Sequence, residues 1–172
     1  MHNTTKIENR EPEVDTSKLG TIDESTGKEI TNATYKLNKT PISVKSNDTI
    51  TYTIRVYNEG SVAGFANEIT ENIPEGLEFI VDNEINKEYK WKMLDKDGEV
   101  TTSVINAQKV TTDYLSSKDP SNIIDAMQNK DGQKVISFKD IKIAFKVTEA
   151  ELVDKLMINI ATITKTSEID ID

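Results

Sequence analysis

Two polar residues, Glu71 and Asn159, occupy positions where the strand patterns favour apolar side chains. Glu71 lies on the same alternating face as Ile69 and Ile73, so its carboxyl group is predicted to point into the core. Asn159 falls in the segment 156–164, which is apolar on both faces and is therefore typical of a buried central strand. A buried polar group without a hydrogen-bond partner costs about 1–3 kcal/mol. The two side chains are therefore expected either to hydrogen-bond to nearby backbone or to react with a neighbour in the core.

A second group of oxygen ligands lies in the stretch DKDGE at 95–99. Its alternating acids offer ligands to calcium, and Asp95 and Asp97 are the candidate metal ligands. The stretch is shorter than an EF-hand loop and is equally typical of a hairpin turn. The chain has no cysteine and a single histidine, His2, in its polar beginning. Cys/His zinc sites, Cys/His nucleophiles and a Ser-His-Asp triad are therefore excluded, and no cofactor is expected.

Composition narrows the classes of partner. The 172 residues are 35% hydrophobic and 30% charged, with a formal net charge of −9. No stretch concentrates Lys and Arg among aromatic residues, which argues against binding to nucleic acid or to an anionic membrane. No run approaches the roughly 20 apolar residues of a membrane span, so membrane insertion is not expected. The first 15 residues lack an apolar signal core, which predicts either a cytosolic protein or a piece of a larger one.

Short strands are predicted to position these residues. The clearest is 49–57, where β-branched and aromatic residues alternate with polar ones. Further strands are expected at 41–45, 65–73, 77–81, 89–93, 99–104, 136–147 and 156–164. A short helix is expected at 121–127 and one or two helical turns after Thr148. Turn signals every 8–12 residues then predict an all-β, antiparallel sandwich with one or two short helices.

The same patterns divide the chain into three parts. Residues 1–32 are predicted to be a polar leader, extended or partly disordered, with at most a short paired stretch. Residues 33–166 are predicted to form the β-sandwich domain, and 167–172 the start of an acidic linker. Trp91 is expected in the core rather than on a ligand-binding surface, because it lies in the middle of an apolar strand pattern.

The stretch NDTITYTIRVYNEGSVAGFANEITENIPEGLEFI at 47–80, with NIATIT at 159–164, resembles a recurring domain of Gram-positive bacterial surface proteins. That domain, catalogued mainly as one of unknown function, is related to the fimbrial isopeptide-forming domains. The resemblance covers about residues 41–165. The matching positions are Asn47, Asp48, Tyr52, Thr53, Ile54, Val56, Asn58, Gly60, the run 69–74, Gly76, Leu77, Phe79, Asn159 and Ala161. It implies an immunoglobulin-like sandwich, tandem arrays, secretion and display on the cell wall.

The resemblance also implies a chemistry for Glu71 and Asn159. They match the acid and the amide of the isopeptide-forming relatives, although the usual acid at the position of Glu71 is Asp. A lysine amine in an apolar core loses its proton and becomes nucleophilic. A neighbouring protonated carboxylic acid can polarise the asparagine carbonyl while ammonia leaves.

The reactive lysine is not evident. In the relatives it lies on the first strand, whereas here Lys6 lies in a segment without apolar alternation. Four other lysines fall on the solvent side of their predicted strands, namely Lys36, Lys45, Lys142 and Lys146. We therefore expect the reactive lysine to lie outside this chain. The alternative is that Asn159 and Glu71 only hydrogen-bond to neighbouring backbone.

Two functions of different classes follow. The first is a non-enzymatic structural or adhesive module of a multi-domain cell-surface protein, extracellular, in contact with neighbouring domains of its own chain and with a host or matrix ligand. The alternative is a carbohydrate-binding module of a secreted protein, which would be favoured by an exposed Trp91 or by paired Tyr89 and Tyr114. A glycoside hydrolase needs two opposed carboxylates in a cleft, and no such pair stands out. A cytosolic scaffold would be favoured only if the natural gene began at Met1.

Overall fold

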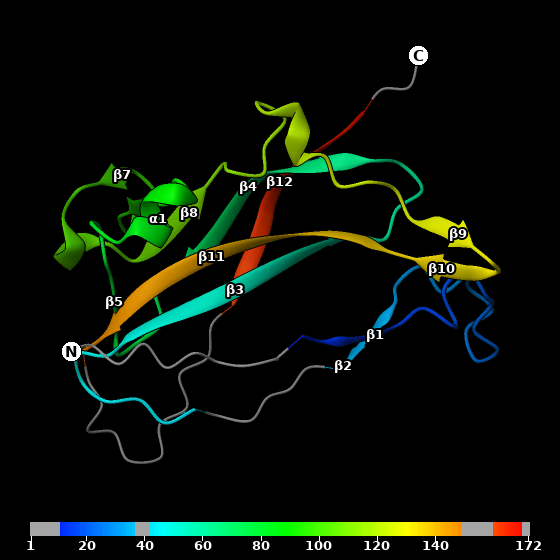
Figure 1. The fold of residues 1–172 in the computed structure, drawn as a ribbon, viewed down its shortest axis with the longest axis horizontal. Coiled ribbons are helices and arrows are strands. Elements are labelled where there is room, and N and C mark those ends of the chain that lie inside the picture. Colours follow the sequence, from blue (N-terminus) through cyan, green and yellow to red (C-terminus); the bar gives the residue numbers. More distant parts are fainter. Residues whose placement is uncertain (1–10, 37–41, 149–159, 170–172) are drawn as a thin grey trace.

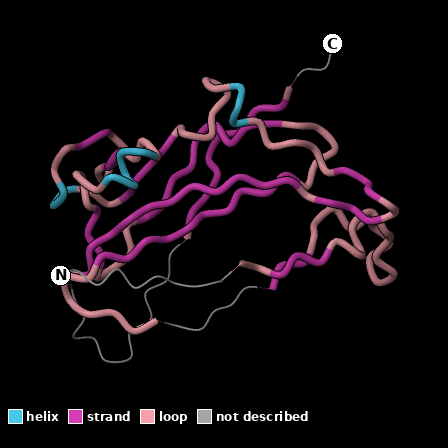
Figure 2. Tube along the Cα trace, viewed as in Figure 1, coloured by secondary structure: helices cyan, strands magenta, loops and turns pink. Residues whose placement is uncertain are grey.

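The computed structural model describes residues 11–36, 42–148 and 160–169, and its strands pair antiparallel throughout (Figure 1). The strands of the two larger sheets are β3 (Thr49–Asn58), β4 (Gly64–Asn72), β5 (Leu77–Phe79), β6 (Lys92–Leu94), β7 (Val100–Thr101), β8 (Lys109–Thr112), β11 (Ser137–Val147) and β12 (Ala161–Glu168). The helical segments are short and lie between strands (Figure 2), namely α1 (Glu84–Glu88), η1 (Val104–Asn106) and η2 (Pro120–Asn122).

The two sheets form a sandwich-like, all-β fold, as predicted. One has three strands in the order β3-β11-β5, and the other has five in the order β12-β4-β8-β6-β7. Their facing sides share one core, because β-branched and aromatic residues alternate along the long strands. The central members are Ile69, Val110, Ile141, Ile143 and Phe145, none more than 1% exposed.

The free edge of β11 is covered by side chains. Strand β5 pairs only with Phe145–Val147, which leaves earlier backbone groups of β11 on that side without a strand partner. Asn86 of α1 replaces the strand: its Nδ2 donates to the Ala144 carbonyl at 2.9 Å, and its Oδ1 accepts from the Ala144 N–H at 2.8 Å. Trp91 Nε1 donates to the Lys142 carbonyl at 2.8 Å. A buried backbone edge is thereby satisfied without another strand.

The predicted polar leader, residues 1–32, contributes one strand to a pair whose other strand begins the segment assigned to the sandwich domain. Strands β1 (Glu13–Asp15) and β2 (Thr34–Lys36) pair antiparallel, and Leu19 between them is buried. This part contacts the sandwich through hydrogen bonds, because Thr16 Oγ1 donates to the Lys134 carbonyl and Tyr35 Oη donates to Glu59 Oε1. Lys134 belongs to β10 (Gln133–Val135), which pairs only with β9 (Gln128–Lys130).

Several sequence-based boundaries differ from the structure: no strand forms at 42–45, the strand expected at 99–104 is only Val100–Thr101, and the one expected at 77–81 ends at Phe79. The segment 89–93 is not one strand, since Tyr89 ends α1 and the strand there is limited to Lys92–Leu94. The helix expected at 121–127 is only the single turn η2, because the backbone is already extended at Ile123, with ψ of 135°, and Ile124 pairs with Gly64. Strand β12 continues to Glu168, so the first two residues of the predicted acidic linker belong to the sheet.

Candidate functional site

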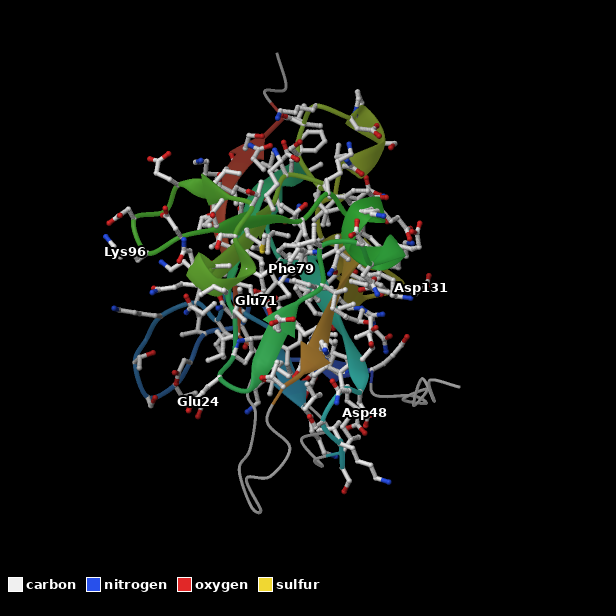
Figure 3. All side chains as sticks on the ribbon, turned by 90° about the vertical axis from the view of Figure 1, so that its left-hand side faces the viewer. Glu24, Asp48, Glu71, Phe79, Lys96 and Asp131 are labelled. Atoms are coloured by element: carbon white, nitrogen blue, oxygen red, sulfur yellow. The ribbon has the colours of Figure 1, made fainter. Side chains whose placement is uncertain are left out.

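Glu71 is buried in the core, as its position in the alternation predicts. Its side chain lies near the middle of the molecule (Figure 3), and the residue is 1% exposed. Its neighbours across β4 are Val110 on β8 and Ala161 on β12. Burial raises the pKa of Tyr52 on the facing sheet, and the charge of Glu71 raises it further. The carboxyl group of Glu71 therefore belongs to the space between the two sheets.

Asn159, the predicted partner of this acid, lies outside the described residues. The described strand begins two positions later, with Ala161 directly opposite Glu71. The lysines predicted to face solvent are exposed at Lys36, Lys45 and Lys142, while Lys146 is half-buried. None of the lysines that the structure describes is buried. The remaining lysines, Lys6, Lys39 and Lys155, lie outside the described residues.

The DKDGE stretch forms the turn between β6 and β7. Asp95 Oδ1 accepts from the backbone N–H groups of Asp97 at 2.9 Å and Glu99 at 3.0 Å. Asp97 forms a 2.7 Å ion pair with Lys96 on the exposed surface. Across residues 11–36, 42–148 and 160–169, no group of three or more acidic, His or Cys side chains is placed to hold a metal ion. Hydrogen bonding within the turn accounts for Asp95, and calcium binding at Asp95 and Asp97 stays an untested prediction.

The aromatic residues separate into core and surface. Trp91 is 7% exposed and its indole N–H is bonded to β11, so it is a core residue, as predicted. Tyr89 and Tyr114 form the pair that would favour a saccharide site: their ring centroids lie 4.8 Å apart in an edge-to-face arrangement. Both rings are half-buried. Such paired rings are held firmly and present a fixed aromatic surface.

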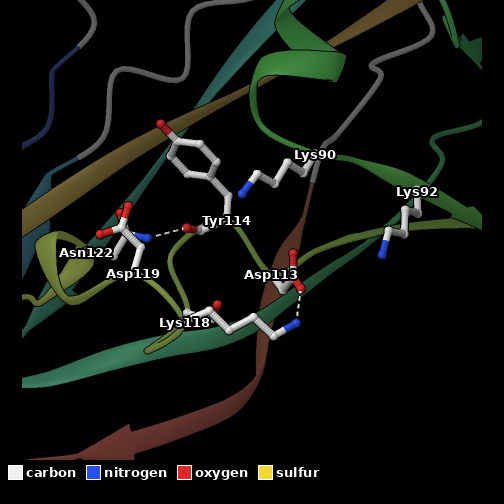
Figure 4. A pocket seen from close by; sticks show the side chains of 8 residues that line it. Lys90, Lys92, Asp113, Tyr114, Lys118, Asp119 and Asn122 are labelled. Carbon is white, nitrogen blue, oxygen red and sulfur yellow. Dashed lines mark hydrogen bonds and ion pairs between the residues drawn. The ribbon is translucent and has the colours of Figure 1, made fainter.

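An open pocket of about 410 Å³ lies beside this tyrosine pair (Figure 4). It is lined by Lys90, Lys92, Asp113, Tyr114, Ser116, Lys118, Asp119 and Asn122. The residues come from three places: the end of α1 and strand β6, the segment after β8, and the turn η2. Ligand pockets usually have volumes of about 300–1,000 Å³ and mostly apolar walls. This pocket has the size, and polar and charged residues line it around one aromatic ring, although more of its lining surface is apolar than polar.

Both pocket acids are engaged within the protein. Lys118 Nζ lies 2.6 Å from Asp113 Oδ2, and this hydrogen bond holds the pKa of Asp113 below its usual range. Asp119 accepts from the backbone N–H and the hydroxyl of Ser121 at 2.9 and 2.7 Å, which lowers its pKa as well. Among the described residues, neither Lys90 nor Lys92 forms an ion pair. The pocket therefore presents two lysine amines that have no salt-bridge partner in this part of the chain.

Lys90 stands at an unusual backbone position. It directly follows Tyr89, the C-cap of α1, and has a φ of 54°. This left-handed conformation after a helix normally belongs to Gly, sometimes Asn, because a Cβ there costs about 1–2 kcal/mol. The other described non-glycine residues with positive φ are Asn47 and Asp131, which are types that tolerate it. Lys90 is thus the one described residue with an ill-suited side chain at such a position.

Sequence reasoning missed this lysine pocket. The amino-acid sequence contains no usable sign of the pocket. A lysine that follows a short helix is unremarkable until the φ angle of its backbone is known. The three lysines come from positions 90, 92 and 118, and only the folded chain shows that they surround one ring. Lys90 Nζ lies 5.9 Å from the centroid of Tyr114, at the outer limit of a cation–π contact.

In three comparisons with known proteins, no family model, no curated protein and no solved structure matched the chain. The described part of the chain also contains no helix that is both long and apolar enough to cross a membrane. Its function is therefore inferred from the residues, their geometry and the sequence resemblance described above.

Proposed function

We propose that the chain is a non-enzymatic structural or adhesive module of a multi-domain cell-surface protein. It is displayed outside the cell, contacts neighbouring domains of the same protein and presents a surface to a host or matrix ligand. The observation that carries the proposal is the buried carboxyl group of Glu71, which lies opposite Ala161, two residues after Asn159. Together with the sequence resemblance, this arrangement supports an immunoglobulin-like module closed by an internal covalent bond.

The bond is an isopeptide between a lysine amine and the side-chain amide of Asn159. The neutral amine attacks the amide carbon, a C–N bond forms, and ammonia leaves with the former amide nitrogen. In this mechanism Glu71 acts in its protonated form: it hydrogen-bonds to the carbonyl oxygen and carries a proton from the amine to the departing nitrogen. No described lysine is buried, so a lysine of this chain could supply the amine only from Lys6, Lys39 or Lys155; the other source is a lysine outside the chain, as the sequence analysis expects. Such a bond would make the module resistant to pulling forces.

The intact mass of the denatured chain tests this chemistry. A wild-type mass short by one ammonia would mean that a lysine of this chain has closed the bond. The variants Asn159→Ala and Glu71→Gln should each show the full mass expected from their sequences. Asn106→Ala is the matched control, because Asn106 is exposed and lies in η1. It should keep the missing ammonia, and peptide mapping of the wild type then identifies the lysine.

A full wild-type mass would contradict a cross-link within this chain and would leave a module held by packing alone. Display outside the cell is tested separately, with an amine-reactive reagent that does not cross membranes. The exposed lysines, for example Lys45 and Lys142, should be labelled on intact source cells. Labelling only after lysis would contradict extracellular display.

A carbohydrate-binding module is the second candidate, and one observation favours it. Tyr89 and Tyr114 are paired beside an open polar pocket, which is the arrangement that the sequence analysis named as supporting this function. An adhesive module and a saccharide-binding module are compatible, because a surface ligand of the first can be the saccharide of the second. Binding of oligosaccharides to the full chain, measured by isothermal titration calorimetry, tests this function.

A further inference from the structure

We propose that the lysine pocket binds a saccharide unit that carries a negative charge, as a carboxylate or a sulfate group. The lysine pocket is the hollow lined by Lys90, Lys92, Lys118, Asp113 and Tyr114, with the neighbouring polar residues given above. The inference rests on the second candidate function and names its substrate class.

The polar side chains of the pocket, set beside apolar surface, suit a ligand that has both hydroxyl groups and apolar ring faces. Around the single ring of Tyr114 the pocket offers ammonium, hydroxyl and amide groups. These groups donate and accept hydrogen bonds at several angles, as a sugar ring requires. The face of a pyranose can pack on an aromatic ring, and Tyr89 holds the ring of Tyr114 in place. Asn122 steadies the same residue, because its Nδ2 donates to the Tyr114 carbonyl at 2.6 Å.

The charges in the pocket select an anion. Lys118 and Asp113 neutralise each other at 2.6 Å, whereas Asp119, hydrogen-bonded by Ser121, keeps its negative charge, so three lysines against two acids leave the pocket with one net positive charge. Lys90 and Lys92 then remain as cations that flank the hollow, and Figure 4 shows the Lys90 amine directed toward Tyr114. A carboxylate or sulfate between these amines gains charge-assisted hydrogen bonds. This local preference stands against the net charge of −9, which repels anions at long range.

The backbone at Lys90 supports a functional role for its amine. Glycine would adopt the φ of 54° without strain, yet the position carries a long cationic side chain that lines the pocket. Strain of this kind persists at sites where the side chain has a task. The Lys90→Gly variant therefore removes the amine while relieving the backbone, which separates a loss of binding from a loss of folding.

The test is calorimetric titration of the full chain at low ionic strength with three probes. These are a sulfated heparin-derived tetrasaccharide, a carboxylated hyaluronan-derived tetrasaccharide and a neutral dextran-derived tetrasaccharide. We expect at least one anionic probe to bind, the neutral probe to bind at least about fivefold more weakly, and added salt to weaken anionic binding. Lys90→Gly and Lys92→Gln should each reduce anionic binding by about fivefold or more.

Two controls distinguish a loss of binding in the pocket from a loss of folding and from a general effect of removing a surface lysine. The urea midpoint of Lys90→Gly should equal or exceed that of the wild type. Lys130→Gln changes an exposed lysine at the end of β9, away from the pocket, and should leave binding unchanged.

Each contrary outcome would overturn a different part of the proposal. Equal binding of the neutral and anionic probes would overturn the inference about charge and leave the carbohydrate-binding function standing. No binding of any probe would overturn both. Binding of inorganic sulfate as tight as that of the sulfated probe would show a simple anion site and overturn the saccharide assignment. Equal losses for Lys130→Gln and Lys90→Gly would show that the pocket is not the site.

Discussion

The side chain of one residue, Asn86, makes the backbone hydrogen bonds that a neighbouring strand makes elsewhere in the sheet. Its side chain is fully buried and makes three hydrogen bonds to backbone, two with Ala144 and one with the Ile80 carbonyl at 2.9 Å. An asparagine amide has the donor and acceptor spacing of a peptide group, so it fits the ladder in place of one. The residue thereby attaches α1 to the middle of the three-stranded sheet.

Replacing Asn86 by Ala is expected to lower the free energy of unfolding by about 3 kcal/mol. The substitution leaves the buried N–H and C=O groups of Ala144 without partners, and each such group costs about 1–3 kcal/mol. Urea denaturation followed by tryptophan fluorescence measures the change, since Trp91 lies on the same edge. Asn129→Ala, on the exposed strand β9, is the control and should change stability by less than about 0.5 kcal/mol. A loss for Asn86→Ala no larger than that of the control would contradict the role given to this side chain.

At the scale of elements, Gly64 at the start of β4 allows the backbones of β12 and of the segment around Ile124 to approach closely. A Cβ at this position would lie 2.7 Å from the Ser167 carbonyl oxygen on β12. The backbone of Gly64 also pairs with Ile124, with N···O distances of 3.1 and 2.8 Å. Glycine is therefore required here by close approach of backbone rather than by its φ angle.

Gly64→Ala is expected to destabilise the chain by about 1–3 kcal/mol and to loosen the end of β12. The added methyl group forces backbone apart, because a carbonyl oxygen cannot turn away as a side chain can. Urea denaturation gives the stability, and hydrogen exchange of the β12 amides gives the local effect. Gly60→Ala is the milder control, since the nearest atom there is the side-chain oxygen of Asn58 at 3.1 Å. Unchanged hydrogen exchange of the β12 amides would mean that the backbone accommodates the methyl group without loosening the end of β12, which would contradict the prediction.

The attachment of β12 to β4 also depends on pH. Glu68 is hydrogen-bonded by Lys165 Nζ at 2.7 Å and by Thr164 Oγ1 at 2.8 Å, and these bonds hold its pKa below the ordinary value of 4.5. A carboxyl group with a lowered pKa in the folded state stabilises the fold above its unfolded pKa. The contribution of Glu68 is therefore complete at pH 7 and is lost as the pH falls below about 4.5.

A carboxyl-carbon NMR titration of Glu68 is expected to give a midpoint below 4.5 in the wild type. Lys165→Gln should raise that midpoint toward 4.5, because the largest contribution to the shift is removed. Lys165→Arg keeps the charge and should keep the midpoint low. A midpoint that is the same in all three proteins would contradict the ion pair as the cause.

The sequence predicted the long elements well and the short ones poorly. Strands β3 and β11 and the burial of Glu71 and Trp91 follow from alternation, since a half-buried strand needs period two. Helix α1 was missed because five residues are too few to show a helical period, and its capping residue Asn83 resembles a turn residue. The lysine pocket was missed because its members meet only through long-range contacts. The local sequence pattern carries no information about which distant residues become neighbours in the folded chain.

The whole molecule carries a strong negative charge at neutral pH. Its formal net charge is −9, and most ion pairs among the described residues lie on the exposed surface, for example Lys36 with Glu13. Exposed pairs contribute about 0–1 kcal/mol each, whereas the excess acids repel one another across the molecule. We therefore expect the repulsion, and not the ion pairs, to dominate the response to salt.

Raising NaCl from about 0.02 M to about 0.5 M at pH 7 should increase the urea midpoint, because added ions screen the repulsion. At the isoelectric pH, close to 4.7, the same addition should have little effect or lower the midpoint. Equilibrium denaturation at the two pH values measures both. A midpoint that falls with salt at pH 7 would mean that the ion pairs outweigh the net charge.

Helix α1 and the residues that follow it limit strand exchange between neighbouring copies of the chain at the edge of β11. An open strand edge recruits strands from identical neighbours during folding, and repeated domains on one chain are especially prone to this exchange. Along β11 the groups that would recruit them, at Lys142 and Ala144, are already bonded to Trp91 and Asn86. A neighbouring copy therefore cannot extend a ladder at Ala144 or at the Lys142 carbonyl, because these groups are already bonded.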